Sequence, residues 1–524
     1  MKTYCTLSTL FARELERLSR QEYDDLYRKK THELLKTLWT SRRHSCEFVN
    51  DEYYPVPLFA VEFSRIAGGG QIMATCDEDG YLTLIDASKN SSFGKYESGC
   101  CSADFRRNTS ENEVSLGINK RRCTSGERML SFRVHENAIF SLCWLGLEDQ
   151  CIATASGDQK VKIFDVNKHL ILNTLVGHSG SVKAIKEKNL TDGKILGSAS
   201  RDGSVMIWDT RCHGTHNQET GSYVLRPVLI LNDIHRREID SPSKRQHVAK
   251  RLRYSLYPKK KSMKPNVPHG VTALAFAPFN ETFFLYTSGA VDGAVKLWDL
   301  RRAGAVSLPA KPISKIYPGC QEGLTDRPHG ISSLDVAADG STLCVASTDS
   351  NIYLYKTGLL DRGSFTRLCG HRTSSFYIKA CFSPEGNFVL SGSADSYAYI
   401  WDVKQLGWNS TKNNFPLLRL PAHNNEVTDV AWCMTDTTKL ATVGDDCLLK
   451  LWQTRNSDEE PETVQDGQRV QAEFKLESLQ QENFWTSNVQ RTVNLEFPTS
   501  RTENTNTLLS YFHKPISRMC TASH

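Results

Sequence analysis

The chain lacks any run of eighteen or more apolar residues, which excludes a membrane-spanning helix. It also lacks the long apolar core and small-residue cleavage site of a secretory signal, because charge enters early in MKTYCTLSTLFARELERLSR. No pair of its 16 cysteines has the CxxC spacing of a zinc site. Most stand singly in strand-like stretches, as in ACFSPE around Cys381, and we expect free thiols in a reducing compartment. We therefore predict no metal ion, no cofactor and no membrane partner.

The bulk composition fits a soluble globular protein with some disordered segments, since 39% of the 524 residues are hydrophobic and 23% are charged. This length allows one large repeat domain with tails, or two or three ordinary domains. The net charge of +5 is modest, so the distribution of charge says more than its total.

A repeated pattern decides between these possibilities. In seven segments, an Asp in a predicted tight turn is followed six positions later by an aromatic or apolar strand residue. The pairs are Asp79/Ile85, Asp158/Phe164, Asp202/Trp208, Asp292/Trp298, Asp349/Tyr355, Asp395/Trp401 and Asp446/Trp452. Six segments also have a His 20 to 24 residues before the Asp: His135, His178, His269, His329, His371 and His423. Four short strands per unit of roughly 40–45 residues are typical of propeller blades.

Each unit contains a strand, a hairpin turn and a second strand, as in SASRDGSVMIWD and SGAVDGAVKLWD. The pattern resembles the WD-repeat family over about residues 50–455, which implies an all-β, seven-bladed β-propeller. One four-stranded blade cannot bury both of its faces, so the blades must close into a ring. In that family the repeated His and Asp hydrogen-bond within the blade and the Trp is core, so we interpret all three as structural.

The repeat predicts three parts of the chain: an N-terminal helical extension (1–46), the propeller (47–456) and a disordered tail (457–524). Apolar residues recur at helical intervals in residues 7–40, which indicates one long or two shorter amphipathic helices. The tail begins SDEEPETVQDGQ and has the weak periodicity of a disordered segment.

Two consecutive units end in W-D-x-R, as Trp208, Asp209 and Arg211 and as Trp298, Asp299 and Arg301. Each Arg would place a rigid, five-donor guanidinium on the rim of the ring, where it suits an acidic or carbonyl-rich partner. A single Arg of this kind is more often solvated or paired within its own chain, but two in adjacent units favour binding. The arrangement is similar to the double W-D-x-R box of receptors that dock on the cullin-4 adaptor, the large damaged-DNA-binding subunit.

Within those receptors, the chain most resembles the denticleless family. The matching stretches are IWDTRC (207–212), SGAVDGAVKLWDLR (288–301), KIYPGCQEGLT (315–325) and GHRTSSFYIKACFSPEGNFVLSGSADSYAYIW (370–401). The N-terminal extension looks longer and more helical than in that family, and the C-terminal tail is much shorter. The resemblance implies a non-catalytic, nuclear substrate receptor of a cullin-4 RING ubiquitin ligase, which recruits replication and cell-cycle proteins for ubiquitin-dependent degradation.

Near the end of the chain, Leu508, Tyr511 and Phe512 stand at i, i+3 and i+4, so one helical turn would place them on one side. This is the geometry of peptides that bind the apolar site of the replication sliding clamp, although Thr505 replaces the usual first glutamine. An apolar triplet in a tail is more often an accident. Denticleless proteins carry a similar glutamine-less element, so the resemblance implies the sliding clamp as a second partner.

Two spacings between repeated Asp residues are too long for a bare blade and predict flexible inserts at about 87–128 and 212–267. The second insert contains Lys259, Lys260 and Lys261 after a Pro, which resembles a nuclear-import signal. A solvated loop is the plainer interpretation, and non-specific contact with DNA around the clamp is a further one.

The sequence leaves two questions open. The N-terminal helices can insert into the adaptor or pack on the propeller's own floor. The alternative function is a WD-repeat scaffold of a chromatin or RNA-processing complex. An enzyme is disfavoured, because no nucleophile is paired with a base outside the repeated His and Asp.

Overall fold

The computed structural model divides the chain into two units, Met1–Lys475 and Leu476–His524, and every described residue belongs to the first. The described residues are 20–40, 44–50, 54–87, 130–146, 148–188, 193–218, 221–235, 269–277, 283–303, 311–319, 329–404, 414–454 and 470–474.

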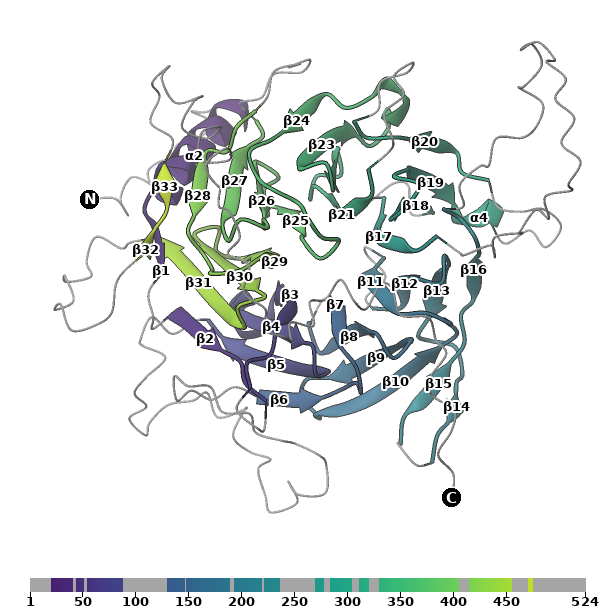
Figure 1. Ribbon diagram of the computed structural model, residues 1–524. Coiled ribbons are helices and arrows are strands. Elements are labelled where there is room, and N and C mark those ends of the chain that lie inside the picture. Colours follow the sequence, from purple (N-terminus) through teal and green to yellow (C-terminus); the bar gives the residue numbers. More distant parts are fainter. Residues whose placement is uncertain are drawn as a thin grey trace, which may run out of the picture. The chain divides into compact units, whose positions relative to one another are not determined.

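Seven small sheets stand around a common centre, and we name these blades A to G in chain order (Figure 1). Blade A contains β3 (Leu58–Phe63), β4 (Ile72–Asp77), β5 (Tyr81–Asp86) and β6 (Leu130–Arg133), with the one-turn α3 (Ala67–Gly70). Blade B contains β7 (Ile139–Leu145), β8 (Cys151–Ser156), β9 (Lys160–Asp165), β10 (Leu170–Val176), β14 (Thr215–His216) and β15 (Tyr223–Leu225). Blade C contains β11 (Val182–Glu187), β12 (Ile195–Ser200), β13 (Val205–Asp209) and β16 (Leu229–Leu231).

The remaining blades complete the circle. Blade D contains β17 (Val271–Phe276), β18 (Phe284–Gly289), β19 (Val295–Asp299) and β20 (Ser314–Ile316), with α4 (Leu300–Ala303) after β19. Blade E contains β21 (Ile331–Val336), β22 (Thr342–Ser347), β23 (Asn351–Lys356) and β24 (Thr366–Leu368), with the 3₁₀ turn η4 (Leu360–Arg362). Blade F contains β25 (Ala380–Phe382), β26 (Phe388–Ser391), β27 (Ala398–Asp402), β28 (Leu418–Leu420) and β33 (Glu473–Phe474). Blade G contains β29 (Val427–Trp432), β30 (Lys439–Gly444), β31 (Leu448–Thr454), β1 (Leu38–Thr40), β2 (Ser45–Glu47) and β32 (Val470–Gln471).

The inner strands are neighbours all the way round, in the order β3, β7, β11, β17, β21, β25, β29 and again β3. This closure confirms the predicted seven-bladed propeller. Apolar side chains fill the space between adjacent sheets, and four of the repeated aromatic residues are among the most buried: Trp208, Trp298, Trp401 and Trp452. Burial between sheets is what a single blade could not achieve alone.

The turn after each second strand explains the repeated Asp. The residue that follows this Asp has a positive φ in all seven blades: Gly80, Gln159, Gly203, Gly293, Ser350, Ser396 and Cys447. Glycine adopts this left-handed backbone without a steric penalty, which accounts for the Asp-Gly text of three blades. In the other four blades a residue with a side chain adopts this conformation, which has a steric cost. The surrounding tertiary structure therefore has to stabilise the turn in those blades.

The last blade is completed by segments from outside the repeat. β1 and β2 both pair with β31, at Trp39↔Gln453 and Cys46↔Leu449, so the N-terminal segment forms the outer strand of blade G. β32 then pairs with β1, and β33 pairs with β28 of blade F. The boundaries predicted at residues 46 and 456 are therefore displaced, because residues from both predicted tails lie in the sheets.

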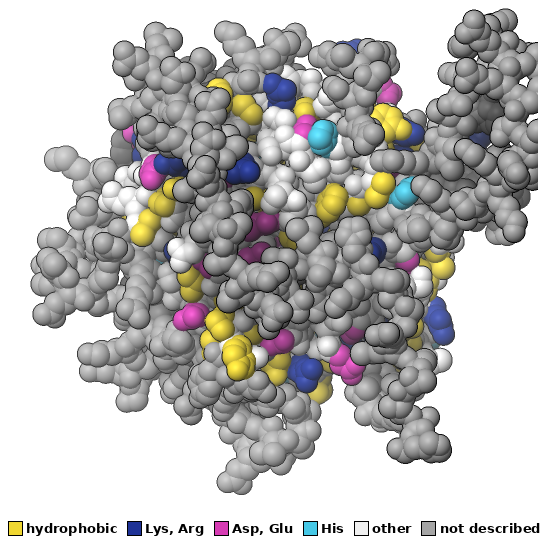
Figure 2. All heavy atoms as spheres, viewed as in Figure 1, with side chains coloured by type: hydrophobic (Ala, Val, Ile, Leu, Met, Phe, Trp, Pro, Cys, Tyr) yellow, Lys and Arg dark blue, Asp and Glu magenta, His cyan; other side chains and the backbone are white. Residues whose placement is uncertain are grey.

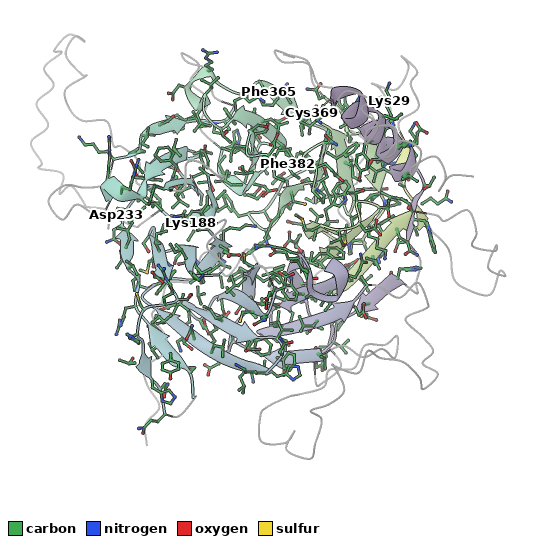
Figure 3. All side chains as sticks on the ribbon, turned by 180° about the vertical axis from the view of Figure 1, so that it is seen from behind. Lys29, Lys188, Asp233, Phe365, Cys369 and Phe382 are labelled. Carbon is green, nitrogen blue, oxygen red and sulfur yellow. The ribbon has the colours of Figure 1, made fainter. Side chains whose placement is uncertain are left out.

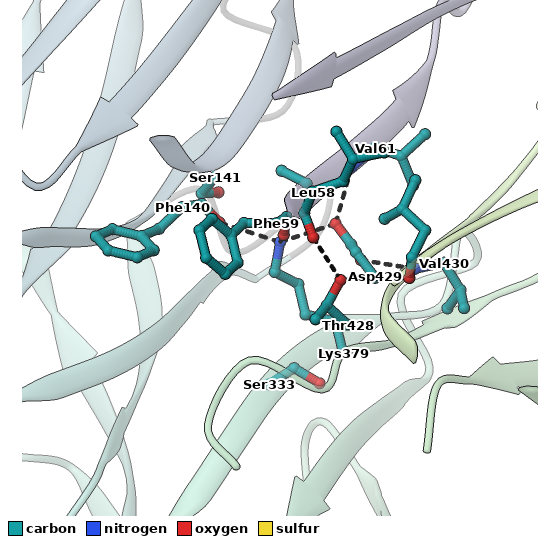
Figure 4. A network of polar contacts seen from close by, with 12 residues as sticks. Leu58, Phe59, Val61, Phe140, Ser141, Ser333, Lys379, Thr428, Asp429 and Val430 are labelled. Carbon is teal, nitrogen blue, oxygen red and sulfur yellow. Dashed lines mark hydrogen bonds and ion pairs between the residues drawn. The ribbon is translucent and has the colours of Figure 1, made fainter. Parts of the chain in front are cut away.

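A polar network fastens the first blades to the last (Figure 4). The Lys379 ammonium donates to the carbonyl oxygens of Phe59 (3.1 Å) and Phe140 (3.2 Å) and to the Asp429 carboxylate (2.8 Å). The same carboxylate accepts a bond from the Val61 amide (3.0 Å). One side chain thus joins blades A, B, F and G, and the hydrogen bonds satisfy charges that burial would otherwise penalise.

Helix α2 (Arg20–Leu35) packs on blades F and G. Leu35 is fully buried in a cluster that includes Phe388 and Trp452. Tyr27 donates to the Glu385 carboxylate at 3.2 Å. The described part of the predicted N-terminal helices therefore lies against the propeller, while residues 1–19 lie outside the described residues.

The insert predicted at 212–267 is partly wrong. Residues 215–231 contain β14, β15 and β16, and β16 is the outer strand of blade C. β15 pairs in parallel with β10, so it extends blade B from the side. The prediction failed because these strands have two or three residues each, too few to show a period of two. Most of the insert predicted at 87–128, and residues 236–268, lie outside the described residues.

Candidate functional site

The repeated His and Asp form buried pairs in four blades. His178 Nδ1 lies 3.1 Å from Asp202, and its Nε2 lies 2.7 Å from the Ser198 hydroxyl, to which Trp208 also donates. Blade G repeats the whole chain of contacts through His423 and Trp452, and blade B repeats the two histidine contacts through His135. Each histidine ties the turn to the middle of its sheet, which supports the structural interpretation.

In blade D the prediction of His269 is wrong. His235 takes the position, with Nδ1 2.9 Å from Asp292 and Nε2 2.9 Å from the Thr287 hydroxyl. His235 stands 57 residues before Asp292, because the segment 236–268 separates it from the first strand of its blade. A search limited to a spacing of 20 to 24 residues could not find it.

Blades E and F also depart from the predicted pairing. Asp349 accepts a hydrogen bond from Tyr353 (2.6 Å), and Asp395 accepts one from Tyr399 (2.7 Å). His329 is exposed. His371 is buried, and neither of its ring nitrogens has a hydrogen-bond partner among the described residues. Burial lowers the pKa of His371 to about 4, so its ring is neutral at physiological pH.

The ring has two distinct ends. We call the end that holds the Asp turns and their histidines the His–Asp face. The third strands of blades C and D run away from this face. In blade C, for example, β13 begins at Val205, close to the turn, and ends at Asp209, which pairs with Ile195 at the far end. We call that far end the Arg face, because both W-D-x-R motifs end there.

The two W-D-x-R motifs have the same geometry. Trp208 and Trp298 are buried between the blades. Arg211 donates to both oxygens of Asp209 at 2.9 and 2.6 Å, and Arg301 donates to both oxygens of Asp299 at 3.0 and 2.9 Å. These bonds lower the pKa of each carboxyl and raise that of each guanidinium.

Both guanidinium groups remain accessible in spite of this pairing. The side chain of Arg211 is 61% exposed and that of Arg301 is 57% exposed. A bidentate pair uses two of the five donors of a guanidinium and fixes its orientation. The remaining donors are therefore oriented in advance for acceptors on a partner, on two adjacent blades of one face.

Residues that the sequence did not single out surround Arg301. Phe283 is 45% exposed, and two cations from neighbouring blades lie over its ring: Lys188 at 4.9 Å and Arg301 at 5.0 Å from the centroid. Lys188 follows β11 of blade C, on the other side of the ring from Lys29 of α2 (Figure 3). No local motif identifies Phe283, because its exposure depends on how the two blades meet.

Blade F uses the same Asp position differently. Asp402 ends β27 as Asp209 ends β13, but Lys404 replaces the motif's Arg. Arg28 of α2 binds Asp402 at 3.1 Å, and this pair is largely buried, with the two side chains 12% and 5% exposed. The N-terminal helix therefore supplies in blade F the cation that the repeat itself supplies in blades C and D.

The His–Asp face carries an aromatic cluster around the start of the inner strands. Phe59, Phe140 and Tyr377 have ring centroids 5.3 to 5.7 Å apart, and the Lys183 ammonium lies 3.2 Å from the Phe140 centroid. Burial raises the pKa of Tyr377 to about 12, and the charges of Arg201 and of the carboxylates Asp445, Glu78 and Glu426 also act on this side chain. Burial and the nearby carboxylates Glu426 and Glu78 raise the pKa of Asp445 to about 7. The face viewed in Figure 2 has acidic side chains near its middle.

The other predicted site residues cannot be placed. Thr505, Leu508, Tyr511 and Phe512 lie outside the described residues, as do Lys259, Lys260 and Lys261. Within the described part of the chain, no group of three or more His, Cys, Asp or Glu side chains is arranged to hold a metal ion. No helix among the same residues has the length and hydropathy that a bilayer span requires.

Comparison with known protein families identifies WD repeats in this chain. The family profile described as WD domain, G-beta repeat matches residues 126–165, 170–209, 262–299, 321–356, 363–402 and 414–453. The first three strands of blade A lie outside these segments, and this blade also lacks the upstream His of the repeat.

Among curated proteins, the chain is 32% identical over 420 residues to the Denticleless protein homolog of Danio rerio, which covers 79% of this chain and 54% of that protein. It is 32% identical over 417 residues to the Denticleless protein homolog of Homo sapiens, covering 78% and 48%. It is 30% identical over 398 residues to Protein lethal(2)denticleless of Drosophila melanogaster, covering 76% and 44%. The chain spans about half the length of the curated relatives that it matches.

Proposed function

The chain belongs to the denticleless family of WD-repeat proteins, and from this membership we propose that it is a substrate receptor of a cullin-4 RING ubiquitin ligase. In this role the chain is not an enzyme. It holds replication and cell-cycle proteins near the charged conjugating enzyme and so raises the effective concentration of their lysines. The family resemblance implies that it works in the nucleus, on chromatin.

The Arg face is the proposed docking surface for the adaptor, the large damaged-DNA-binding subunit. The observation that carries this proposal is the pair of exposed guanidinium groups, Arg211 and Arg301, held in the same orientation on adjacent blades. Two oriented charges on one face can engage one partner at two points, which a single surface arginine cannot. Through the adaptor the chain would join cullin-4 and the RING protein.

The His–Asp face is then free for substrates. In its aromatic cluster the half-buried rings of Phe140 and Tyr377 offer rigid contact area, and the buried Phe59 packs beneath them. Aromatic residues are enriched at the centres of protein–protein interfaces, whereas the rim of such interfaces is polar. Placing the substrate opposite the adaptor keeps the two partners from competing for one surface.

The segment 505–512 is the proposed tether to the sliding clamp, with Leu508, Tyr511 and Phe512 as its apolar anchors. A tether that binds the clamp independently of substrate would add avidity for clamp-bound substrates. Lys259, Lys260 and Lys261 are the proposed import signal, with non-specific DNA contact as a further role for the basic insert.

A co-purification experiment tests the central proposal. The full chain carrying Arg211→Ala and Arg301→Ala should lose adaptor binding by at least tenfold, because both charge-assisted contacts are removed. The control carries Arg133→Ala and Arg372→Ala, two exposed arginines at the His–Asp end of the blades, and should bind like wild type. Unchanged adaptor binding by the first variant would remove the main support for the ligase role and favour a WD-repeat scaffold of another complex.

A peptide experiment tests the tether. A synthetic peptide of residues 500–518 should bind the purified sliding clamp, and the same peptide with Tyr511→Ala and Phe512→Ala should not. Both peptides keep the same charge, so a difference reports the apolar anchors alone. No binding at high micromolar peptide would exclude the tether and leave the adaptor proposal untouched.

A further inference from the structure

Exposed aliphatic side chains accompany the two arginines at equivalent positions of blades C and D. Val228 directly precedes the outer strand of blade C, and its amide donates to Ile207 O at 2.8 Å. Ile313 directly precedes the outer strand of blade D, and its amide donates to Leu297 O at 2.7 Å. Both side chains point outward, with 61% and 52% of their surface exposed. Each blade therefore presents one Arg and one aliphatic residue in the same arrangement.

Blade F shows what happens to these positions when a segment covers them. Leu417 is the equivalent residue there, since its amide donates to Ile400 O at 2.7 Å before the outer strand. It is half-buried and packs on the cluster that contains Leu35 of α2. The equivalent Asp402 is bound by Arg28 of the same helix. Helix α2 thus covers both positions of blade F: its Leu35 belongs to the apolar cluster on which Leu417 packs, and its Arg28 neutralises Asp402.

A segment that covers the equivalent positions of blades C and D needs the opposite charge from Arg28. Arg28 fits blade F because Asp402 has no Arg of its own motif beside it. Asp209 and Asp299 are already paired with Arg211 and Arg301, so another cation would meet positive charge. Lys188 over Phe283 adds to this positive charge. A complementary segment must therefore bring carboxylates beside its aliphatic side chains.

We propose that Val228, Ile313 and Phe283 form, with Arg211, Arg301 and Lys188, a continuous docking surface for an acidic, aliphatic segment of the adaptor. This proposal rests on the proposed receptor function and specifies the chemistry of its adaptor contact. The aliphatic residues supply buried apolar area, and the cations on either side select carboxylates and fix the register of the segment. Arginines on a polar surface alone would give selectivity with little buried apolar area.

Photo-crosslinking in the assembled complex tests which segment lies on this surface. A benzophenone amino acid is placed at position 228 or 313 of the full chain, and purified adaptor is added. We expect crosslinks at both positions to one stretch of the adaptor with aliphatic residues and Asp or Glu within about one helical turn of them. The same probe at position 291, where the exposed Val291 lies in the Asp292 turn of the His–Asp face, should give no adaptor crosslink.

Binding measurements give the second readout. Val228→Ser with Ile313→Ser should weaken adaptor binding by about tenfold without lowering the melting temperature, because both side chains are already exposed. Val291→Ser with Tyr317→Ser, two exposed apolar residues of the His–Asp face, is the matched control and should bind like wild type.

The outcomes separate this inference from the receptor proposal. If the adaptor binds and the arginine variant disrupts it, but the serine variant binds normally or crosslinks reach a basic stretch, the docking surface is wrong and the receptor role stands. If the wild-type chain does not bind the adaptor, the receptor role fails and this inference fails with it.

Discussion

Blade F and the pair of blades C and D start from similar repeat sequences and reach different structures at both faces. At the Arg face, Asp209 and Asp299 hold exposed arginines of their own motifs, whereas Asp402 holds the buried Arg28 of α2. At the His–Asp face, blades C and D have complete His–Asp pairs, whereas His371 of blade F has no hydrogen-bond partner among the described residues. The same repeat position can therefore stabilise the ring or present a group to a partner, depending on what covers it.

The largest expected effect comes from separating Arg28 from Asp402. Arg28→Ala should lower the free energy of unfolding by roughly 3 kcal/mol, because it leaves the Asp402 carboxylate buried without its cation. Denaturant unfolding of the full chain measures this difference. Lys29→Ala, on the exposed side of the same helix, is the control and should change stability by less than about 0.5 kcal/mol. Equal effects of the two variants would show that α2 is not held by this ion pair.

The next largest effect tests which histidine stabilises the Asp292 turn of blade D. His235→Ala should cost about 2 kcal/mol, since Asp292 and the Thr287 hydroxyl lose their buried partner. His269→Ala should cost less than about 0.5 kcal/mol, because His269 is half-exposed. Urea unfolding of the two variants decides the assignment. The opposite ranking would return the structural role to His269.

The unpaired histidine of blade F predicts a pH effect. The pKa of His371 is lowered from 6.5 to about 4, so between these values the folded state binds fewer protons than the unfolded chain. Stability is therefore fully present above pH 6.5 and falls as the pH drops toward 4, by up to about 1.4 kcal/mol per pH unit for this group.

His371→Leu should make this acid loss shallower by about one proton. The buried histidines of other blades have lowered pKa values as well (His135, His235 and His423), so some dependence should remain. Unfolding curves between pH 7 and 4.5 measure the slope. A variant with the wild-type slope would mean that His371 finds a partner in solution.

The smallest stability effect belongs to the exposed arginines. Arg211→Ala with Arg301→Ala should lower the melting temperature much less than Arg28→Ala, because both guanidinium groups are exposed and Arg302 still lies 3.7 Å from the Asp299 carboxylate. This result contrasts with the loss of adaptor binding expected for the same variant. A large drop in melting temperature would place these arginines with Arg28, as structural residues.

Prediction from sequence succeeded where the pattern is local and repeated. The Asp turns, the alternating strands and the buried Trp residues recur in units of similar length, and the structure confirms seven blades. It failed where one element is interrupted or very short. His235 was missed because 57 residues separate it from Asp292, and β16 was missed because it has three residues. The W-D-x-R arginines could be located from the sequence, but Phe283 and Lys188 could not, since two blades have to meet before these residues are neighbours.

The sequence by itself determined the blade count and the turns, because a repeated local pattern specifies the same strand–turn–strand geometry wherever it occurs. Only the tertiary structure decided which side chain completes each blade. Arg28 reaches Asp402 across 374 residues, and β1 joins β31 from the other end of the chain. Such pairings form only when the ring closes and brings distant segments together. The spacing of residues along the sequence therefore does not predict them.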